Sequence, residues 1–249
     1  MLNETPWLRC LLITSEAFWE KQIKDNYNKT NTVDVTVIVS NYNYSKYIDE
    51  CLLSLKEEEL HSPNVSFNVV VIDDASTDES REIIASWSVS WNKIKPLYCR
   101  ENIGIANAIN FAVSKCKHSK AVVRVDADDT IKPGFLKDLW FYFKSTNGPY
   151  PSPRLAVACN YDIWNQDLTE VIEKDVNSSI KNIACGVMYP QLVFELIGYE
   201  PGRRHKEEEN LQTRNIAMIP YYLNKSLYNY RRHSSNKTLQ PEYKTTKVN

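Results

Sequence analysis

The chain has 249 residues, 43% hydrophobic and 24% charged, which is typical of a globular protein and argues against extensive disorder. Its 30 Lys and Arg balance 31 Asp and Glu, so no global charge favours nucleic acid as a partner. No apolar run approaches the roughly 20 residues of a membrane span, and the first residues lack the pattern of a signal peptide. We expect a cytoplasmic protein without a transmembrane span, and peripheral contact with a membrane stays open.

Cysteine usage agrees with a reducing compartment. No C-x-x-C pair occurs, and the cysteines lie among apolar residues in expected helices and strands. We interpret them as reduced core residues rather than disulfides. They are Cys10, Cys51, Cys99, Cys116, Cys159 and Cys185.

Residues 1–32 come first and carry two aromatic-rich helical stretches and a polar linker. We interpret this segment as an N-terminal helical arm that docks on the rest of the chain, with dimerisation or a membrane contact as alternatives.

From Val33 the pattern becomes β-branched and almost continuously apolar, as in strands that are covered on both faces of a parallel sheet. Helical patterns with one apolar face separate the strands. The alternation predicts an open, mostly parallel α/β sheet within residues 33–150. The expected strands are 33–40, 67–73, 94–99 and 121–125.

The expected helices have specific signals. The first places Tyr47, Ile48, Cys51, Leu52 and Leu55 on one face. Ser76 and Glu79 have the spacing of a capping box, which predicts the start of the second helix. A third helix is expected over 102–116, and Pro133 is suited to open a fourth.

The pattern loosens after Pro153. It predicts an α+β half over residues 151–235 of the same domain, followed by a tail at 236–249. Strands are expected at 155–164 and 169–175, helices at 189–198 and 207–214, and two extended segments at 215–223 and 226–233.

Polar residues gather where the four parallel strands end: "SNYN" (40–43), "DDAS" (73–76), "RENIG" (100–104) and "DADD" (126–129). Ligands of such sheets bind beyond the carboxyl ends of the strands. Clustered carboxylates repel one another unless a cation lies between them, and hard divalent cations often share oxygen ligands with substrate phosphates. Both G-x-G-x-x-G and the Walker loop are missing, which disfavours a dinucleotide or P-loop site. Taken alone, "DADD" would also suit a solvated turn.

The stretches "VTVIVSNYNYSKYIDECLLSL", "NVVVIDDASTDES", "RENIGIANAIN" and "VVRVDADDTIKPGFL" resemble successive signatures of the family-2 nucleotide-sugar glycosyltransferases. "EEENLQTR" and "YRRH" extend the resemblance over residues 34–235. It implies the GT-A fold, a Rossmann-like α/β architecture. In that fold a mixed, mostly parallel sheet is flanked by helices, and the C-terminal half is a looser α+β arrangement.

The resemblance also implies roles around the nucleotide. Tyr42 matches the aromatic residue that lies against the base, and Asp74 matches the carboxylate that reads the polar edge of the base. Asn102 and Gly104 match the turn and helix start beside the nucleotide, where backbone N–H groups could face a phosphate. The alternatives are a surface tyrosine, a helix-capping aspartate and a simple turn.

Asp126 and Asp128 match the D-x-D motif of the family. The match implies a direct metal ligand at Asp128, a second at Asp126 nearer the ribose, and Mn or Mg as the metal. Asp129 would orient the loop or contact the donor sugar, and His233 would reach the metal or the diphosphate. Arg231 and Arg232 could pair with phosphate oxygens or be simple surface charges.

Glu207 and Glu208 match the Glu-Asp pair of the family when Arg214 is aligned with its arginine. Glu208 is then the expected general base, although it replaces an aspartate and so shifts the reach by about one methylene group. A solvated acidic helix start is the alternative, and Glu209 is a further candidate base.

These implications predict a metal-dependent, inverting glycosyltransferase. It would move a sugar from a nucleotide diphosphate, UDP in the first place, to a hydroxyl of a glycan or lipid-linked glycan. The alternative is a catalytically inactive nucleotide-sugar-binding module of a larger glycan synthase, which the glutamate at position 208 keeps open.

Overall fold

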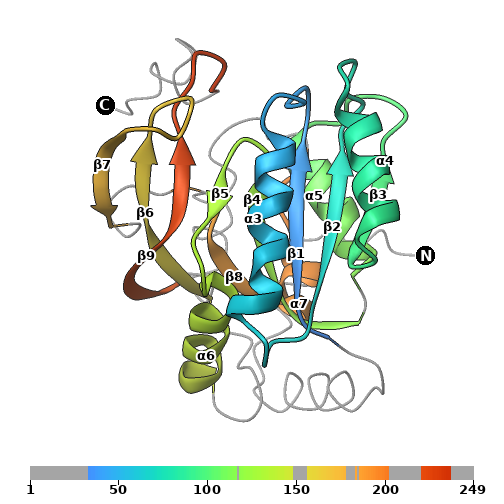
Figure 1. Cartoon of the computed structure of the whole chain (residues 1–249). Helices are drawn as coiled ribbons and strands as arrows, with labels where there is room; N and C mark the ends of the chain where they lie inside the picture. The colour runs from blue at the N-terminus through green and yellow to red at the C-terminus, as the bar shows by residue number, and fades with distance from the viewer. Residues whose placement is uncertain are drawn as a thin grey trace, which may run out of the picture.

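The expected strands pair into one mixed sheet (Figure 1). A computed structural model describes residues 33–116, 118–147, 156–177, 183, 185–201 and 220–236. The strand order is β3-β2-β1-β4-β8-β6-β9-β5, and β7 pairs with β6 outside this path. The resulting architecture is the predicted α/β one, mostly parallel in its first half.

The first half contains four parallel strands and the helices between them. The strands are β1 (Val33–Asn41), β2 (Phe67–Asp73), β3 (Ile94–Tyr98) and β4 (Ser119–Asp126). The helices are α3 (Ile48–His61), α4 (Ser80–Ser90), α5 (Ile105–Ser114) and α6 (Phe135–Asn147). These bounds confirm the strands and helices expected here to within a few residues.

Both faces of this half are buried, as its continuous apolar strands predict. Val37 and Val39 of β1 pack in the core that lies under α3, α4 and α6. Ile38, which points the other way, packs in the core shared with α5 and α7 (Gln191–Ile197). The two-residue period of the strand therefore divides its side chains between two cores.

The strand direction changes where the two halves of the sheet meet, at the pairing of β4 with β8. The strand β8 (Val187–Pro190) runs antiparallel to β4 and to β6 (Val157–Trp164), and β9 (Tyr221–Arg231) runs parallel to β6. The short β5 (Thr130–Ile131) pairs antiparallel with β9, and β7 (Val171–Val176) pairs antiparallel with β6. The strands β1, β2, β6 and β9 all point to the upper edge of the sheet in Figure 1, so their carboxyl ends share one side of the molecule.

Three expectations about local structure are wrong. Ser76 does not cap α4; its hydroxyl accepts hydrogen bonds from the Asn43 backbone N–H (2.9 Å) and from Asn41 Nδ2 (3.1 Å), so it joins the end of β1 to the end of β2. The two extended segments expected after 215 contribute to one continuous strand, β9. The first residues of the helix expected at 189–198 belong to β8, because Tyr189 pairs with Val122 across the sheet.

A buried glutamate fixes the start of α6. The Glu58 side chain, 1% exposed, accepts hydrogen bonds from the backbone N–H groups of Gly134 (2.7 Å) and Leu136 (2.9 Å). These N–H groups are among those that a helix start leaves without intrahelical partners. Glu58 therefore caps α6 from α3 and holds the chain that follows the acidic segment 126–129.

The five described cysteines are free and buried, which confirms them as core thiols. Within the described residues, no helix has both the length and the apolar character needed to cross a membrane. The expected N-terminal arm, the helix at 207–214 with Glu207 and Glu208, and the tail beyond Asn236 lie outside the described residues.

Candidate active site

The ends of β2, β1 and β4 are tied together by backbone hydrogen bonds. Asp74 N–H donates to the Asn41 carbonyl (2.9 Å), and Ala127 N–H donates to the Ser40 carbonyl (3.1 Å). Adjacent strand ends therefore place the Asp74 segment, the Tyr42 segment and the acidic segment next to one another. Residues 126–129 are called the acidic loop below.

Asp126 is clamped in its ionised form. Its carboxylate accepts hydrogen bonds from Ser40 Oγ (2.6 Å), Arg124 Nε (2.8 Å) and Arg124 Nη2 (3.1 Å). Burial opposes ionisation, but the Arg124 charge and the hydrogen bonds of Arg124, Cys185 and Ser40 outweigh it and hold the pKa of Asp126 below its ordinary value. Asp126 thus contributes a fixed negative charge at the end of β4.

The pKa of Asp129 is shifted in the opposite direction to that of Asp126. It is 1% exposed, and its carboxylate accepts hydrogen bonds from the Tyr228 hydroxyl (2.8 Å) and the Arg231 backbone N–H (2.7 Å). Burial and the charges of Asp128 and Asp126 raise the pKa of Asp129 well above its ordinary value. Burial and the neighbouring carboxylates therefore both disfavour the ionised form of Asp129.

Asp128 and His233, both expected near the metal, contact each other in the structure. His233 Nε2 lies 2.9 Å from Asp128 Oδ2, and Asn236 Nδ2 lies 3.3 Å from the same oxygen. The other ring nitrogen of His233 lies 2.8 Å from Ser235 Oγ. Two tyrosine rings cover the imidazole, with centroid distances of 4.8 Å for Tyr47 and 5.8 Å for Tyr44.

This donor set fits a hard divalent cation. Carboxylates suit Mg and Mn, and imidazole is a common ligand of transition metals. Ligand atoms of Asp126, Asp129 and Cys185 also lie within 4.8 Å of one another. A thiolate is a soft ligand, which suits zinc better than Mg or Mn. Asp128 and His233 are not part of this group, although carboxylate and imidazole are the better ligands on chemical grounds.

The "RENIG" segment (100–104), which was expected beside a phosphate, donates hydrogen bonds to Asp74. The backbone N–H groups of Ile103 and Gly104 donate to the two oxygens of Asp74 (2.8 and 2.9 Å), and Asn102 Nδ2 donates to the Asp74 carbonyl (3.2 Å). These two N–H groups point at a carboxylate of the protein, and the expected contact of the segment with a nucleotide phosphate stays a prediction. Gly104 has φ +82°, a backbone conformation that L side chains rarely adopt.

Tyr42, which follows the end of β1, has a partly exposed side chain. It is 40% exposed at the end of β1, which leaves the ring accessible to a ligand. The neighbouring Asp73 is instead structural, because it accepts hydrogen bonds from Asn41 Nδ2 (2.9 Å) and Arg81 Nε (2.7 Å). Of the "DD" pair, Asp74 is the one that lies between the strand ends and the start of α5.

The predicted phosphate role of Arg231 is wrong. Its guanidinium is buried and donates to the carbonyl of Asp128 (2.7 Å), the carbonyl of Gln166 (2.7 Å) and the carboxylate of Glu50. Arg232, the next residue, is exposed. The pattern "YRRH" contains both arginines, and only the pairing of β9 with β5 and β6 determines which of them points inward.

Sequence reasoning missed several residues that surround the acidic loop. Tyr44 and Tyr47 cover His233, Ser40 holds Asp126, and Tyr228 bridges the Asp126 backbone N–H (3.2 Å) to Asp129. Tyr228 is fully buried, but Leu227 beside it is buried too, so burial along β9 does not alternate there and gave no signal for Tyr228. Tyr44 precedes α3, where no periodicity applies, so its placement has no such signal either.

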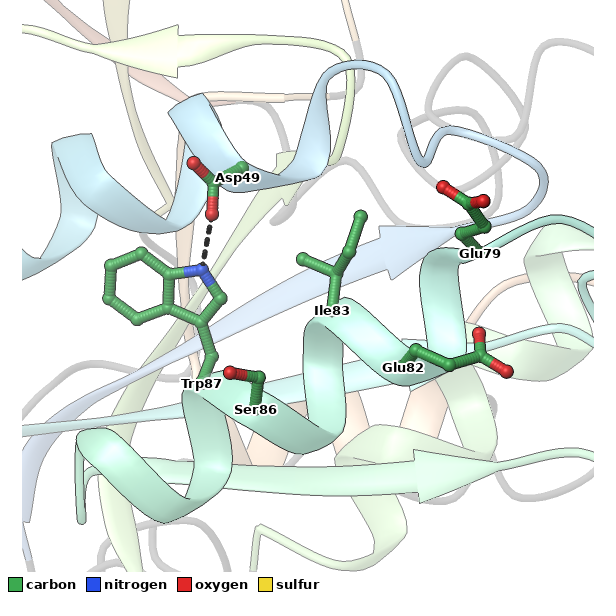
Figure 2. Close-up of a pocket in the computed structure, with 6 residues that line it drawn as sticks. All are labelled: Asp49, Glu79, Glu82, Ile83, Ser86 and Trp87. Atoms are coloured by element: carbon green, nitrogen blue, oxygen red, sulfur yellow. Dashed lines mark hydrogen bonds between the residues drawn. The ribbon is translucent and has the colours of Figure 1, made fainter.

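A separate hollow of about 510 Å³ lies between α3 and α4. Figure 2 shows Asp49 of α3 facing Trp87 of α4, whose indole N–H donates to the Asp49 carboxylate (2.8 Å). Ile83, Ser86, Glu79 and Glu82 complete the lining. None of the predicted site residues lines this hollow, and the acidic loop is the better candidate for chemistry.

Comparison with known proteins defines the class. A profile of the family described as Glycosyl transferase family 2 matches residues 36–223, most of the chain. The chain belongs to this family. Glycosyltransferase GlyG of Streptococcus pneumoniae serotype 4 is 25% identical over 227 residues, which cover 81% of this chain and 72% of GlyG.

Structural likeness agrees with the family. The crystal structure of Staphylococcus aureus TarS 1-349 in complex with UDP-GlcNAc matches with a TM-score of 0.64 and 22% identity, covering 82% of this chain and 60% of that one. In sequence, the poly(ribitol-phosphate) beta-N-acetylglucosaminyltransferase TarS is 36% identical over 103 residues, 41% of this chain and 18% of TarS. A structure of GalNAc-T7 with UDP, GalNAc and Mn²⁺ matches at TM-score 0.63 and 13% identity, covering 82% and 44%. The predicted GT-A fold is confirmed, and the chain spans less than two thirds of these matched structures.

Proposed function

We propose that this chain is a metal-dependent, inverting glycosyltransferase. It moves one sugar from a UDP-sugar to a hydroxyl of a glycan or of a lipid-linked glycan. The main support is the Asp128–His233 pair, 2.9 Å apart beside the clamped Asp126, at the carboxyl edge of the sheet in a family 2 chain. The UDP-GlcNAc in the matched TarS structure favours UDP as the nucleotide.

Asp128, Asp126 and His233 would hold Mn or Mg. When bound, such a cation offsets the negative charge that develops on the departing diphosphate. The crowding of carboxylates in the acidic loop supports this role, because a cation would relieve the repulsion from Asp128 and Asp126 that adds to burial in raising the pKa of Asp129. Asp129 then orients the loop through its bonds to Tyr228 and Arg231 or contacts the donor sugar.

The nucleotide lies across the ends of β1 and β2 in this proposal. The exposed Tyr42 ring stacks against the base, and Asp74 accepts a hydrogen bond from its polar edge. Each Asp74 oxygen already accepts one backbone N–H, which orients the carboxylate and leaves it lone pairs for a ligand. Residues 33–150 are accordingly the donor half, and residues 151–235 the acceptor half.

The chemical step is a single displacement. The carboxylate of Glu208, with Glu207 beside it, takes the proton of the acceptor hydroxyl as that oxygen forms a bond to the anomeric carbon. The bond between this carbon and the diphosphate oxygen breaks, and its electron pair leaves with the diphosphate. Attack on the face opposite the leaving group inverts the anomeric centre.

Calorimetry with UDP, GDP, dTDP and CMP, with and without Mn, tests the donor class, followed by donor hydrolysis. We expect UDP to bind more tightly when Mn is present and to show slow release of sugar from the matching UDP-sugar. No binding of any nucleotide in either condition would contradict the proposal. Metal-dependent binding without hydrolysis or transfer, across a panel of acceptors, would instead support the inactive binding module.

A further inference from the structure

Arg231 is a buried cation inside the site, 2% exposed. Burying a guanidinium is costly unless its donors are paired. Its three nitrogens donate to three different segments. Nε reaches the carbonyl of Asp128 (2.7 Å), Nη1 the carbonyl of Gln166 (2.7 Å), and Nη2 the carboxylate of Glu50. One side chain therefore joins the acidic loop, the turn between β6 and β7, and the first turn of α3.

The backbone of the same residue adds a fourth connection. The Arg231 N–H donates to Asp129 Oδ1 (2.7 Å), so side chain and backbone hold consecutive residues of the acidic loop. The guanidinium carbon also lies 4.8 Å from the centroid of the Tyr47 ring, which itself covers His233. Arg231 thus touches the surroundings of both Asp128 and His233.

The turn at 165–170 is built to keep its own shape. Asn165 Oδ1 accepts the backbone N–H groups of Thr169 (2.9 Å) and Glu170 (3.2 Å), and Leu168 has φ +53°. Its ionic contact with the turn before α3, Lys46 to Asp167 at 3.9 Å, is exposed to solvent and contributes little. The partly buried hydrogen bond from Arg231 to Gln166 is the stronger restraint on how the turn lies against the acidic loop.

We infer that Arg231 is a positioning residue that couples the acidic loop to the β6–β7 turn, so that fixing the loop with cation and nucleotide also fixes the turn. The inference rests on the proposed function for the ligand that fixes the loop. A rigid acidic loop holds the Asp128 carbonyl and the Asp129 carboxylate still. Arg231 then has a fixed geometry, and Gln166 is held through it.

Hydrogen exchange of the turn in the full chain tests this coupling. We expect amide exchange in residues 165–170 to slow several-fold when Mn and UDP are added to the unaltered protein. In Arg231→Lys the charge stays, but an ammonium group lacks the planar fork that reaches three segments. Slowing at the turn should be lost in this variant, and Mn-dependent UDP binding should weaken about tenfold. Lys174→Arg, at an exposed position of β7 outside the site, should match the unaltered protein.

Two results would overturn the inference. One is unchanged exchange at the turn in the unaltered protein while calorimetry shows Mn-dependent UDP binding, which leaves the proposed function intact. The other is full slowing at the turn in Arg231→Lys. If Arg231→Lys does not fold, the first result still decides, because it needs only the unaltered protein. If the unaltered protein bound no nucleotide at all, the proposed function would fail. This inference, which rests on it, would then fail too.

Discussion

The two halves of the sheet place their polar groups differently. In the parallel half the strands are mainly apolar, as at Val37 and Val71, and the functional side chains lie at or just after the carboxyl ends of the strands, with Ser40 and Arg124 buried beside Asp126. In the second half polar side chains lie within the strands and are buried there, as at Asn160, Asp162 and Arg231. The first arrangement relies mainly on apolar packing inside the sheet. The second needs a hydrogen-bond partner for every buried polar group, usually from a distant segment.

The candidate site combines the two arrangements. The first half supplies the acidic loop at the end of β4, and the second half supplies His233, Asn236 and Arg231, which contact Asp128. A charge cluster that is unfavourable on its own is thereby surrounded by donors from the other half. Substitutions in each half should reveal this division of roles.

The largest effect is expected at Asp128. We predict that Asp128→Asn lowers sugar transfer at least about 100-fold and abolishes the Mn-dependence of UDP binding, because a neutral amide is a weak ligand for a hard cation. The matched change in the second half, His233→Gln, should cost less, about tenfold, because the carboxylates remain. Calorimetry and transfer assays measure both. His61→Gln, at the exposed end of α3, is the control, and equal losses in the two site variants would contradict the ranking.

Glu208 tests the chemistry of the second half without touching the first. Glu208→Ala should lower turnover about 100-fold or more while UDP binding stays unchanged, because a general base acts on the acceptor and not on the nucleotide. Single-turnover kinetics and calorimetry on the same variant separate the two quantities. Normal turnover in Glu208→Ala would show that the base lies elsewhere, and Glu209→Ala would be the next variant.

Glu58 tests whether the parallel half also depends on a buried polar contact. We predict that Glu58→Ala lowers the free energy of unfolding by about 2–4 kcal/mol, because the N–H groups of Gly134 and Leu136 lose their acceptor. Urea unfolding measures the change. Glu57→Ala, the exposed neighbour on the same helix, should change it by less than about 0.5 kcal/mol. Equal unfolding midpoints for both variants would show that the cap contributes little.

Asp162 gives the smallest effect and a pH dependence. Burial opposes its ionisation, but hydrogen bonds from Lys132 (2.6 Å), the Asp175 N–H (2.8 Å) and Ser226 (2.7 Å) hold its pKa below the ordinary value. An acid with a lowered pKa in the folded state stabilises it above the unfolded pKa, and this stabilisation is lost as pH falls through the folded pKa. Asp162→Asn should therefore cost about 1–2 kcal/mol at pH 7, and the difference should shrink below about pH 4.

Urea unfolding of Asp162→Asn at pH 7, 5 and 3.5 measures this difference. Glu170→Gln, an exposed acid in the same half, serves as the control. A constant difference at all three pH values would mean that the loss comes from altered packing rather than from the charge.

The parallel half was predictable for a physical reason. Its strands carry their signal locally, so the run from Phe67 to Asp73 was predicted to the residue. The local prediction failed where a side chain or a backbone segment bonds to a different strand of the sheet. Ser76 has the spacing of a helix cap, yet its hydroxyl is bonded to the end of β1. Tyr189 has the setting of a helix start, yet its backbone pairs with β4.

The sequence by itself determined the α/β class, the positions of the parallel strands and the acidic motif at the end of the fourth, because apolar periodicity and short motifs are local properties. Tertiary structure decided which polar groups meet. It brought His233 to Asp128 across 105 residues. It also turned Arg231 inward and left Arg232 in solvent, and it used the N–H groups of the "RENIG" segment to orient Asp74. These pairings depend on strand register and on the partners available to each buried charge, which only the folded chain specifies.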